Sequence, residues 1–120
     1  MIGISDRTMS AMSYALNGVA ARADARADNM ANASTPGFQA STVKFEDALG
    51  AALASGADPS ETLGRPQVVA QAGPSDARGN NVNFEDEMTG GIKDNLLYET
   101  FVHGFNYKLE LMRSAIGGRA

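Results

Sequence analysis

The feature that most limits what this chain can fold into is the spacing of its apolar residues, which recur every three or four positions near both ends. This spacing places apolar side chains along one face of an α-helix. Between the two patterned ends, residues 50–80 contain several glycines together with Pro59, Pro66 and Pro74. Because proline and glycine interrupt helices, the sequence predicts two long terminal helices joined by an irregular middle.

The predicted fold class is mainly α, with the terminal helices packed as a coiled-coil-like pair. A chain of 120 residues suits a single elongated subunit. Within the connecting segment, residues 38–45 and 67–71 are candidates for strands and residues 46–54 for a short helix. The predicted parts are residues 1–37 (helix and turn), 38–82 (connecting segment) and 83–120 (C-terminal helix).

The N-terminal helix is predicted from about Asp6 to Asn32, with Ser5 or Asp6 as its cap. A helix of this length spans ~40 Å at ~1.5 Å per residue, which a small chain cannot cover on all sides. Its apolar stripe is narrow and rich in methionine and alanine, so the helix needs a partner along its length. The stripe consists of Met9, Met12, Leu16, Val19, Ala23, Ala27 and Met30.

The C-terminal helix is predicted to begin after Asn83, whose side chain can cap it, and to end at Gly117. Carboxylates at residues 85–87 suit the positive end of the helix dipole. Gly90 and Gly91 weaken the first turns and indicate a bend or a close backbone contact. The stripe consists of Tyr98, Val102, Phe105, Leu109, Met112 and Ile116. It is preceded by Met88, Ile92 and Leu96, which lie on a line that is rotated around the helix from the stripe.

Two such stripes bury little apolar surface between them, so we expect neighbouring copies of the chain to complete the core. Arg22 and Arg26 share one side of the first helix, while Asp24 and Asp28 share another. Like charges four residues apart repel each other. We interpret both sets as solvated faces, and the alternative is that opposite charges of adjacent subunits offset them.

Composition excludes several classes of function. The net charge is −4 and no lysine or arginine cluster exists, which argues against nucleic-acid binding. Without cysteine the chain has no disulfide and no thiolate metal site. No run of ~18 apolar residues predicts membrane insertion, and no basic segment followed by an apolar one predicts a cleavable signal peptide.

An enzyme is not expected. The sole histidine, His103, lacks the partners that a metal or catalytic site needs. The acidic run at residues 85–87 is interpreted as a helix first turn, since the glycine turns of metal loops are absent. No glycine pattern suits a phosphate loop. We therefore assign no catalytic, metal or cofactor-binding residue and no cofactor.

The most informative stretch is residues 29–38, Asn-Met-Ala-Asn-Ala-Ser-Thr-Pro-Gly-Phe. The proline disfavours helical geometry at the preceding threonine, and the glycine can adopt the positive φ that a type II turn requires. We expect both asparagine amides to bond carbonyls freed at the helix end, and the phenylalanine to fold back onto the helix. The turn motif comprises Asn29, Asn32, Thr35, Pro36, Gly37 and Phe38.

This run resembles the N-terminal signature of bacterial flagellar rod and hook proteins, Asn-x-Ala-Asn-x-x-Thr-Pro-Gly followed by an aromatic residue. The short chain, residues 45–49, residues 79–83 and a last helix closing on residues 113–116 are similar to the proximal rod members. Phe38 stands where the family more often has tyrosine, and Met30 where it more often has isoleucine or leucine. Both replacements keep an apolar side chain.

The resemblance implies a structural subunit of the flagellar basal body, which self-assembles with other proximal rod proteins into the hollow periplasmic shaft that transmits torque and conducts export. It also implies contacts with the MS-ring protein, the rod adaptor protein and the flagellar type III export apparatus, and export without a cleaved signal. Helices with narrow apolar stripes suit a subunit that folds at the growing end.

A small helical binding module, such as an export chaperone or a secreted adaptor, is the alternative, because it would also use an amphipathic helix pair. The Thr-Pro-Gly turn favours the rod subunit, since a chaperone has no evident need for that turn after its first helix.

Overall fold

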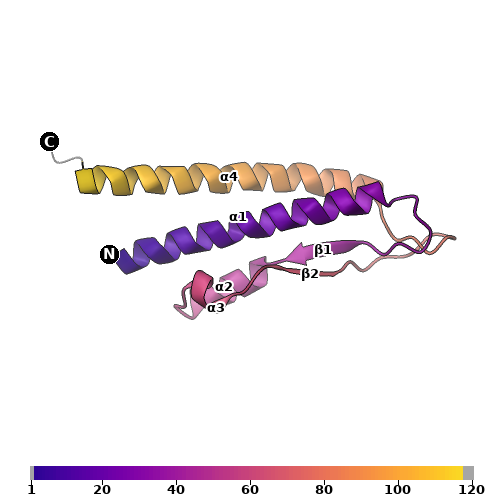
Figure 1. Ribbon diagram of the computed structural model, residues 1–120, viewed down its shortest axis with the longest axis horizontal. Helices are drawn as coiled ribbons and strands as arrows, with labels where there is room; N and C mark the ends of the chain where they lie inside the picture. The colour runs from indigo at the N-terminus through magenta and orange to yellow at the C-terminus, as the bar shows by residue number, and fades with distance from the viewer. Residues whose placement is uncertain (1, 118–120) are drawn as a thin grey trace.

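The computed structural model describes residues 2–117. The molecule is elongated, with extents of 67 × 28 × 15 Å. Figure 1 shows α1 lying between α4 on one side and a layer of short elements on the other. The elements are α1 (Ile2–Ala31), β1 (Ser41–Lys44), α2 (Glu46–Ala54), α3 (Pro59–Thr62), β2 (Gln67–Ala70) and α4 (Phe84–Gly117).

The two long helices pack together, which confirms the predicted fold class. α4 begins after Asn83, and the Asn83 Oδ1 atom accepts a hydrogen bond from the Asp86 N–H at 3.2 Å, as expected for its cap. α1 is helical from Ile2, before the predicted start, and the side chains of Ser5 and Asp6, the predicted caps, lie outside the part of the chain that the structure describes.

The middle segment is more ordered than its composition indicates. The short helix α2 matches the predicted residues 46–54, and the two predicted strands pair antiparallel with Val43 opposite Val68. The prediction of irregular structure missed α3, where Pro59 occupies the first turn and the Asp58 carboxylate accepts a hydrogen bond from the Ser60 N–H at 2.9 Å. An aspartate cap before proline is the signal that marks this start.

The apolar core lies between α1 and the short elements. Phe45 is 2% exposed and meets Tyr14 edge-on, with 6.4 Å between the ring centroids. Gly18 makes room for this packing, because a Cβ atom there would collide with the Phe45 ring. The buried cluster consists of Ala15, Val19, Ala25, Val43 and Phe45. The short elements therefore contribute to the apolar core together with the helix pair.

The predicted stripe of α1 differs from its buried face. Val19 is buried, whereas Ala23 and Ala27 are exposed, and the others are partly buried. Because α1 is covered on two sides, its buried arc is wider and centred elsewhere. That arc includes Ala15, Gly18, Arg22, Ala25 and Asn29 at full or partial burial.

The inward line of α4 also differs from the predicted stripe. The inward residues Glu87 and Asp94 are buried, and Leu97 and Phe101 pack against the core cluster. Val102, Phe105 and Met112 are partly buried, whereas Tyr98, Leu109 and Ile116 are exposed. The difference arises because carboxylates occupy the inward positions near the start of α4, where apolar periodicity cannot detect them.

Candidate functional site

The described residues contain no arrangement that suggests catalysis. Within residues 2–117, no group of three or more histidine, cysteine, aspartate or glutamate side chains is placed to hold a metal ion. His103 is exposed on α4. No helix of the described chain is long and apolar enough to span a bilayer. The distinctive features are instead a buried charge network, a braced turn and an uncovered helix face.

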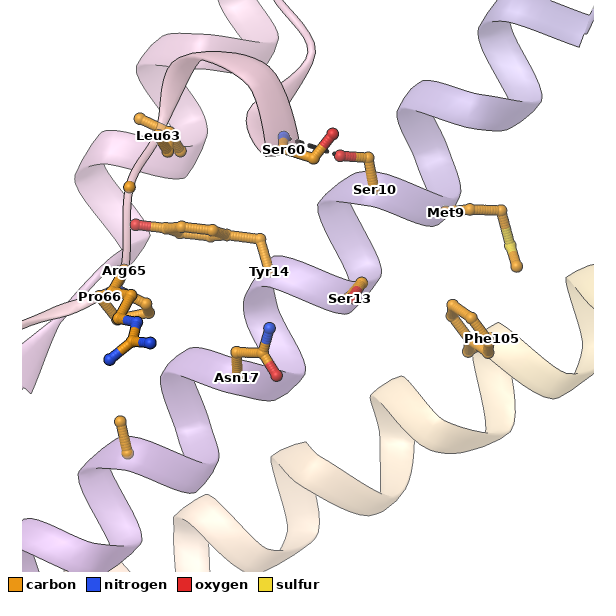
Figure 2. Close-up of a pocket in the computed structure, with 12 residues that line it drawn as sticks. Met9, Ser10, Ser13, Tyr14, Asn17, Ser60, Leu63, Arg65, Pro66 and Phe105 are labelled. Carbon is orange, nitrogen blue, oxygen red and sulfur yellow. Dashed lines mark hydrogen bonds between the residues drawn. The ribbon is translucent and has the colours of Figure 1, made fainter.

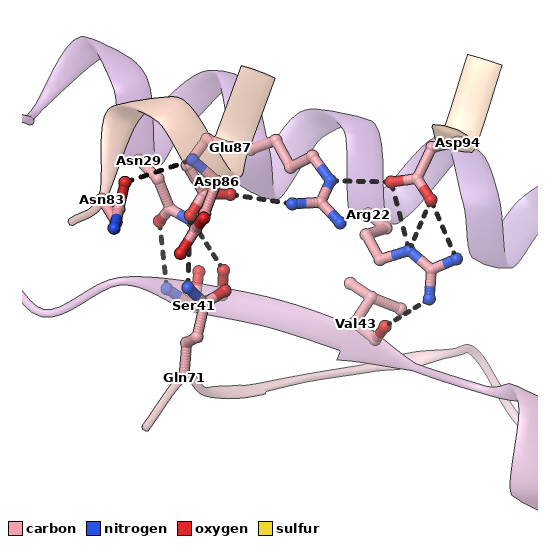
Figure 3. Close-up of polar contacts among 10 residues, drawn as sticks. Arg22, Asn29, Ser41, Val43, Gln71, Asn83, Asp86, Glu87 and Asp94 are labelled. Atoms are coloured by element: carbon pink, nitrogen blue, oxygen red, sulfur yellow. Dashed lines mark hydrogen bonds and ion pairs between the residues drawn. The ribbon is translucent and has the colours of Figure 1, made fainter. Parts of the chain in front are cut away.

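The charge network connects α1 to α4 and to the short elements (Figure 3). Arg26 donates from Nε to Asp94 at 2.7 Å and from NH1 to Glu87 at 3.1 Å. Arg22 reaches Asp94 at 3.0 Å through NH2 and Glu46 at 2.8 Å through NH1. The two arginines therefore bind three carboxylates drawn from two other helices.

Two carboxylates of this network are buried, so each must keep its arginine partner in a defined position. The side chains of Glu87 and Asp94 are 1% and 8% exposed, whereas that of Glu46 is 54% exposed. A buried charge that loses its partner destabilises a fold by about 3–5 kcal/mol, so the described arrangement tolerates little displacement. Every buried side-chain nitrogen and oxygen atom among the described residues has a hydrogen-bond partner.

The network corrects the interpretation of the charged faces. Asp24 and Asp28 are exposed, but Arg22 and Arg26 are mostly buried and neutralised within the same chain. Glu87 does more than favour the helix dipole, because it accepts hydrogen bonds from Arg26 and from two amides. Opposite charges separated by ~60 residues in sequence carry no local signal that would identify them as partners.

Gly90 makes room for Arg26. A Cβ atom at residue 90 would overlap the Arg26 guanidinium, whereas one at Gly91 would lie 4.0 Å from the Arg26 Cδ atom. The predicted close backbone contact near this pair of glycines is therefore confirmed, and its partner is an arginine head group.

The electrostatics of Arg22 and Glu46 follow from their mutual contact. Partial burial alone would raise the pKa of Glu46, but the hydrogen bonds from Arg22 and from the backbone, together with the charge of Arg22, outweigh it and hold that pKa below its usual value. Burial likewise opposes the charged form of Arg22, yet the hydrogen bonds to Glu46 and Asp94 raise the pKa of Arg22 above its usual value. The pair is ionised throughout the neutral range. Arg22 also lies over the Phe45 ring at 5.1 Å.

Asn29 belongs to this network and not to the helix end. Its Oδ1 atom accepts from the Ser41 N–H at 3.0 Å, and its Nδ2 atom donates to the Ser41 carbonyl at 2.8 Å and to Glu87 at 3.2 Å. The expected bond from Asn29 to a freed carbonyl of α1 is therefore wrong. A fully buried amide is more strongly bound by β1 and α4 than by its own last turn.

The rest of the turn motif adopts the expected turn. Asn32 donates from Nδ2 to the Asp28 carbonyl at 2.8 Å, as predicted. Gly37 has a φ of +76°, and the Phe38 N–H donates to the Thr35 carbonyl at 3.2 Å across Pro36 and Gly37. This is the type II geometry that the sequence predicts.

Asn80 and Asn81 brace this turn from the far side of the chain. Asn80 Nδ2 donates to the carbonyls of Asn32 and Thr35, each at 2.8 Å. Asn81 Oδ1 accepts from the Ala40 N–H at 2.6 Å. Two of the segments that carry the family resemblance, residues 29–38 and 79–83, thus meet in space. This contact between distant segments was not predicted from the sequence, although both segments are rich in asparagine.

One face of α4 is not covered by the chain. Its apolar residues Phe84, Met88, Ile92 and Leu96 are 48%, 52%, 64% and 60% exposed. They are four residues apart and, with Met30, line a groove of about 560 Å³. Towards the C-terminal end of the same helix, Tyr107, Leu111 and Ile116 are also exposed.

A second groove of about 730 Å³ lies between α1 and the loop that leads into β2 (Figure 2). Tyr14, Leu63 and Pro66 supply apolar surface, and Ser10 donates to Asp58 at 2.6 Å at its edge. Met9 and Phe105 face each other at the side where α4 passes α1. Met12 contacts the same helix at Gly104, where a Cβ atom would lie 3.4 Å from the Met12 methyl group.

Comparison with known proteins gives one informative similarity. Over 125 residues the chain is 29% identical to the flagellar basal body rod protein FlgB of Aeromonas hydrophila, and the match covers 94% of this chain and 95% of that protein. No protein-family model matches the chain. The similarity supports the flagellar rod family that the turn motif indicates, and with it an association with the basal body.

Proposed function

We propose that this chain is a structural subunit of the flagellar proximal rod, of the B type. It assembles with other rod proteins into the hollow periplasmic shaft that transmits torque and conducts export substrates. Its proposed neighbours are other rod subunits, the MS-ring protein and the rod adaptor protein, and it reaches them through the flagellar type III apparatus. It acts as one elongated unit without catalytic chemistry.

The observation that carries this proposal is the similarity to FlgB over nearly the full length of both chains. The uncovered face of α4 supports it, because a ridge of four large apolar side chains on one helix suits contact with another subunit. The end-to-end similarity also favours the rod subunit over the alternative of a small binding module such as an export chaperone.

The charge network gives the subunit a mechanical role. A shaft transmits torque only if each subunit resists sliding of its helices, and buried ion pairs with fixed geometry oppose such sliding more specifically than apolar contacts do. Arg22 and Arg26 fix α4 against α1 at Asp94 and also hold Glu46 of α2. The same fold leaves the outer face of α4 free for assembly.

Replacing Ile92 with aspartate tests the proposal. Ile92 is 64% exposed, so the isolated chain should keep its fold, while a carboxylate in the assembly contact should abolish swimming of the source bacterium. Thr89→Asp is the matched control, because Thr89 is an exposed α4 residue outside the apolar ridge. Motility is measured on soft agar, with protein level and circular dichroism measured for both variants.

Normal swimming of the Ile92→Asp strain with a normal protein level would contradict the assembly role of this face. Equal loss of swimming with Thr89→Asp would show that any new charge on α4 disturbs function.

A further inference from the structure

The two edges of the small sheet differ in how their backbone groups are used. The Gln71 N–H donates to the Ala40 carbonyl at 2.9 Å, so the backbone groups of these two residues face each other across the strands. In an antiparallel ladder such pairs alternate with pairs whose N–H and C=O groups point outward. Ser41 opposite Ala70 and Val43 opposite Val68 are therefore outward-pointing pairs.

The β1 edge is closed by side chains of α1. Asn29 takes both outward groups of Ser41, with distances of 3.0 Å to the N–H and 2.8 Å to the carbonyl. Arg22 donates to the outward Val43 carbonyl at 3.3 Å. No further strand can pair along this edge without displacing those side chains.

The β2 edge is open. Val68 is 64% exposed and Ala70 is also exposed, and within residues 2–117 their outward backbone groups form no hydrogen bond. The strand is short, which limits pairing, but Gln67–Ala70 contains no charge, no proline and no bulge, which are three other features that protect an edge strand. Beside the start of β2 lies the groove floored by Tyr14 and Ala21 of α1.

We propose that β2 pairs with β2 of a second copy of this chain, antiparallel and about a twofold axis through Val69. Val68 of each copy then faces Ala70 of the other, and all outward groups of both residues are used in main-chain hydrogen bonds. The result is a four-stranded sheet in the order β1, β2, β2, β1, and sheets of three or more strands are more stable than a lone hairpin.

The sequence of β2 favours a second copy of this chain as the partner at its open edge. The two outward residues are placed symmetrically about Val69, and an uncharged strand brings no like charges together across a twofold axis. Because β1 is closed, only β2 can meet β2, and the pairing stops at two copies. The contact is small, so the pair is weak and forms at high protein concentration. This inference does not depend on the proposed rod function.

A single cysteine at residue 69 tests the pairing, because the chain has no cysteine of its own. Across the twofold axis the two Val69 positions form a pair with Cα atoms ~4.5 Å apart, within the range of a disulfide. Gln67→Cys is the matched control on the same strand. Gln67 lies opposite Gln71 of the second copy, so the two Gln67 positions are separated by four residues, or ~13 Å.

We expect purified Val69→Cys to form a disulfide-linked dimer about tenfold faster than Gln67→Cys under mild oxidation. Adding Val68→Pro and Ala70→Pro to Val69→Cys should abolish the difference, because those N–H groups are not used in pairing with β1. Circular dichroism verifies that the double proline variant keeps its helices.

Equal rates for the two single-cysteine variants would overturn the proposal, since pairing about Val69 brings only the thiols at residue 69 together. So would a dimer of the proline variant that forms as fast as that of Val69→Cys alone. Because the experiment uses only the purified chain, its failure would leave the rod assignment unaffected, and a loss of that assignment would leave the pairing intact.

Discussion

At the scale of single residues, Gly90 determines whether the charge network can form. The Arg26 guanidinium occupies the space next to the α4 backbone at this position, held there by Glu87 and Asp94. An arginine side chain can move aside, but here the movement would break contacts to buried carboxylates. The absence of a side chain at residue 90 is therefore required for Arg26 to reach Glu87 and Asp94.

We predict that Gly90→Ala lowers the free energy of unfolding by about 1–3 kcal/mol, because the new methyl group displaces Arg26. Gly91→Ala is the control. Its Cβ atom would meet Arg26 at an ordinary 4.0 Å, so the gain in helix propensity should raise the free energy of unfolding by about 1 kcal/mol. Urea unfolding measures both. Equal stabilisation by the two substitutions would show that Arg26 does not occupy the described position.

Residue-scale reasoning from the sequence succeeded where the cause is local. The positive φ of Gly37 and the Asn83 cap follow from their immediate neighbours, and both are present in the structure. Asn29 was misplaced because its partners, Ser41 and Glu87, lie in other elements. A single sequence contains no signal for contacts of that range.

At the scale of elements, the charge network connects α1 to both α4 and α2. The short helix α2 was predicted with its observed bounds, and it has Glu46 and Asp47 in its first turn and Ser55 at its end. The inward face of α4 differs from the prediction, because apolar periodicity assigns apolar residues to the inside of the fold. Near its start α4 buries carboxylates and exposes Met88, Ile92 and Leu96.

The contact between Arg22 and Glu46 predicts a pH dependence. The pKa of Glu46 is lower in the folded chain than its ordinary value of 4.5, so its charge stabilises the fold above that value. This contribution is lost as the pH falls through the lowered pKa of the folded state. The difference in unfolding free energy between the parent chain and Glu46→Gln should therefore be constant from pH 6 to pH 7 and shrink below about pH 4.5.

Urea unfolding at a series of pH values measures this difference. A difference that stays unchanged down to pH 3 would mean that Arg22 does not hold the Glu46 carboxylate in the folded chain.

At the scale of the whole molecule, the chain buries one side of α4 and leaves an apolar ridge uncovered on another. The fold is long and thin, and its apolar core lies between α1 and the short elements, with Leu97 and Phe101 of α4 packed against it. Composition and periodicity predicted the elongated helix pair, which the structure confirms, whereas the need for neighbours stays a prediction. They did not predict which face stays open, because that choice depends on the buried ion pairs.

The most direct test of the rod assignment is an image of the flagellar basal body isolated from the source bacterium, at a resolution that identifies this chain. We predict that the chain lies in the proximal rod, with Met88, Ile92 and Leu96 against a neighbouring subunit. A rod built entirely from other proteins, or this chain in place with that ridge facing solvent, would contradict the account.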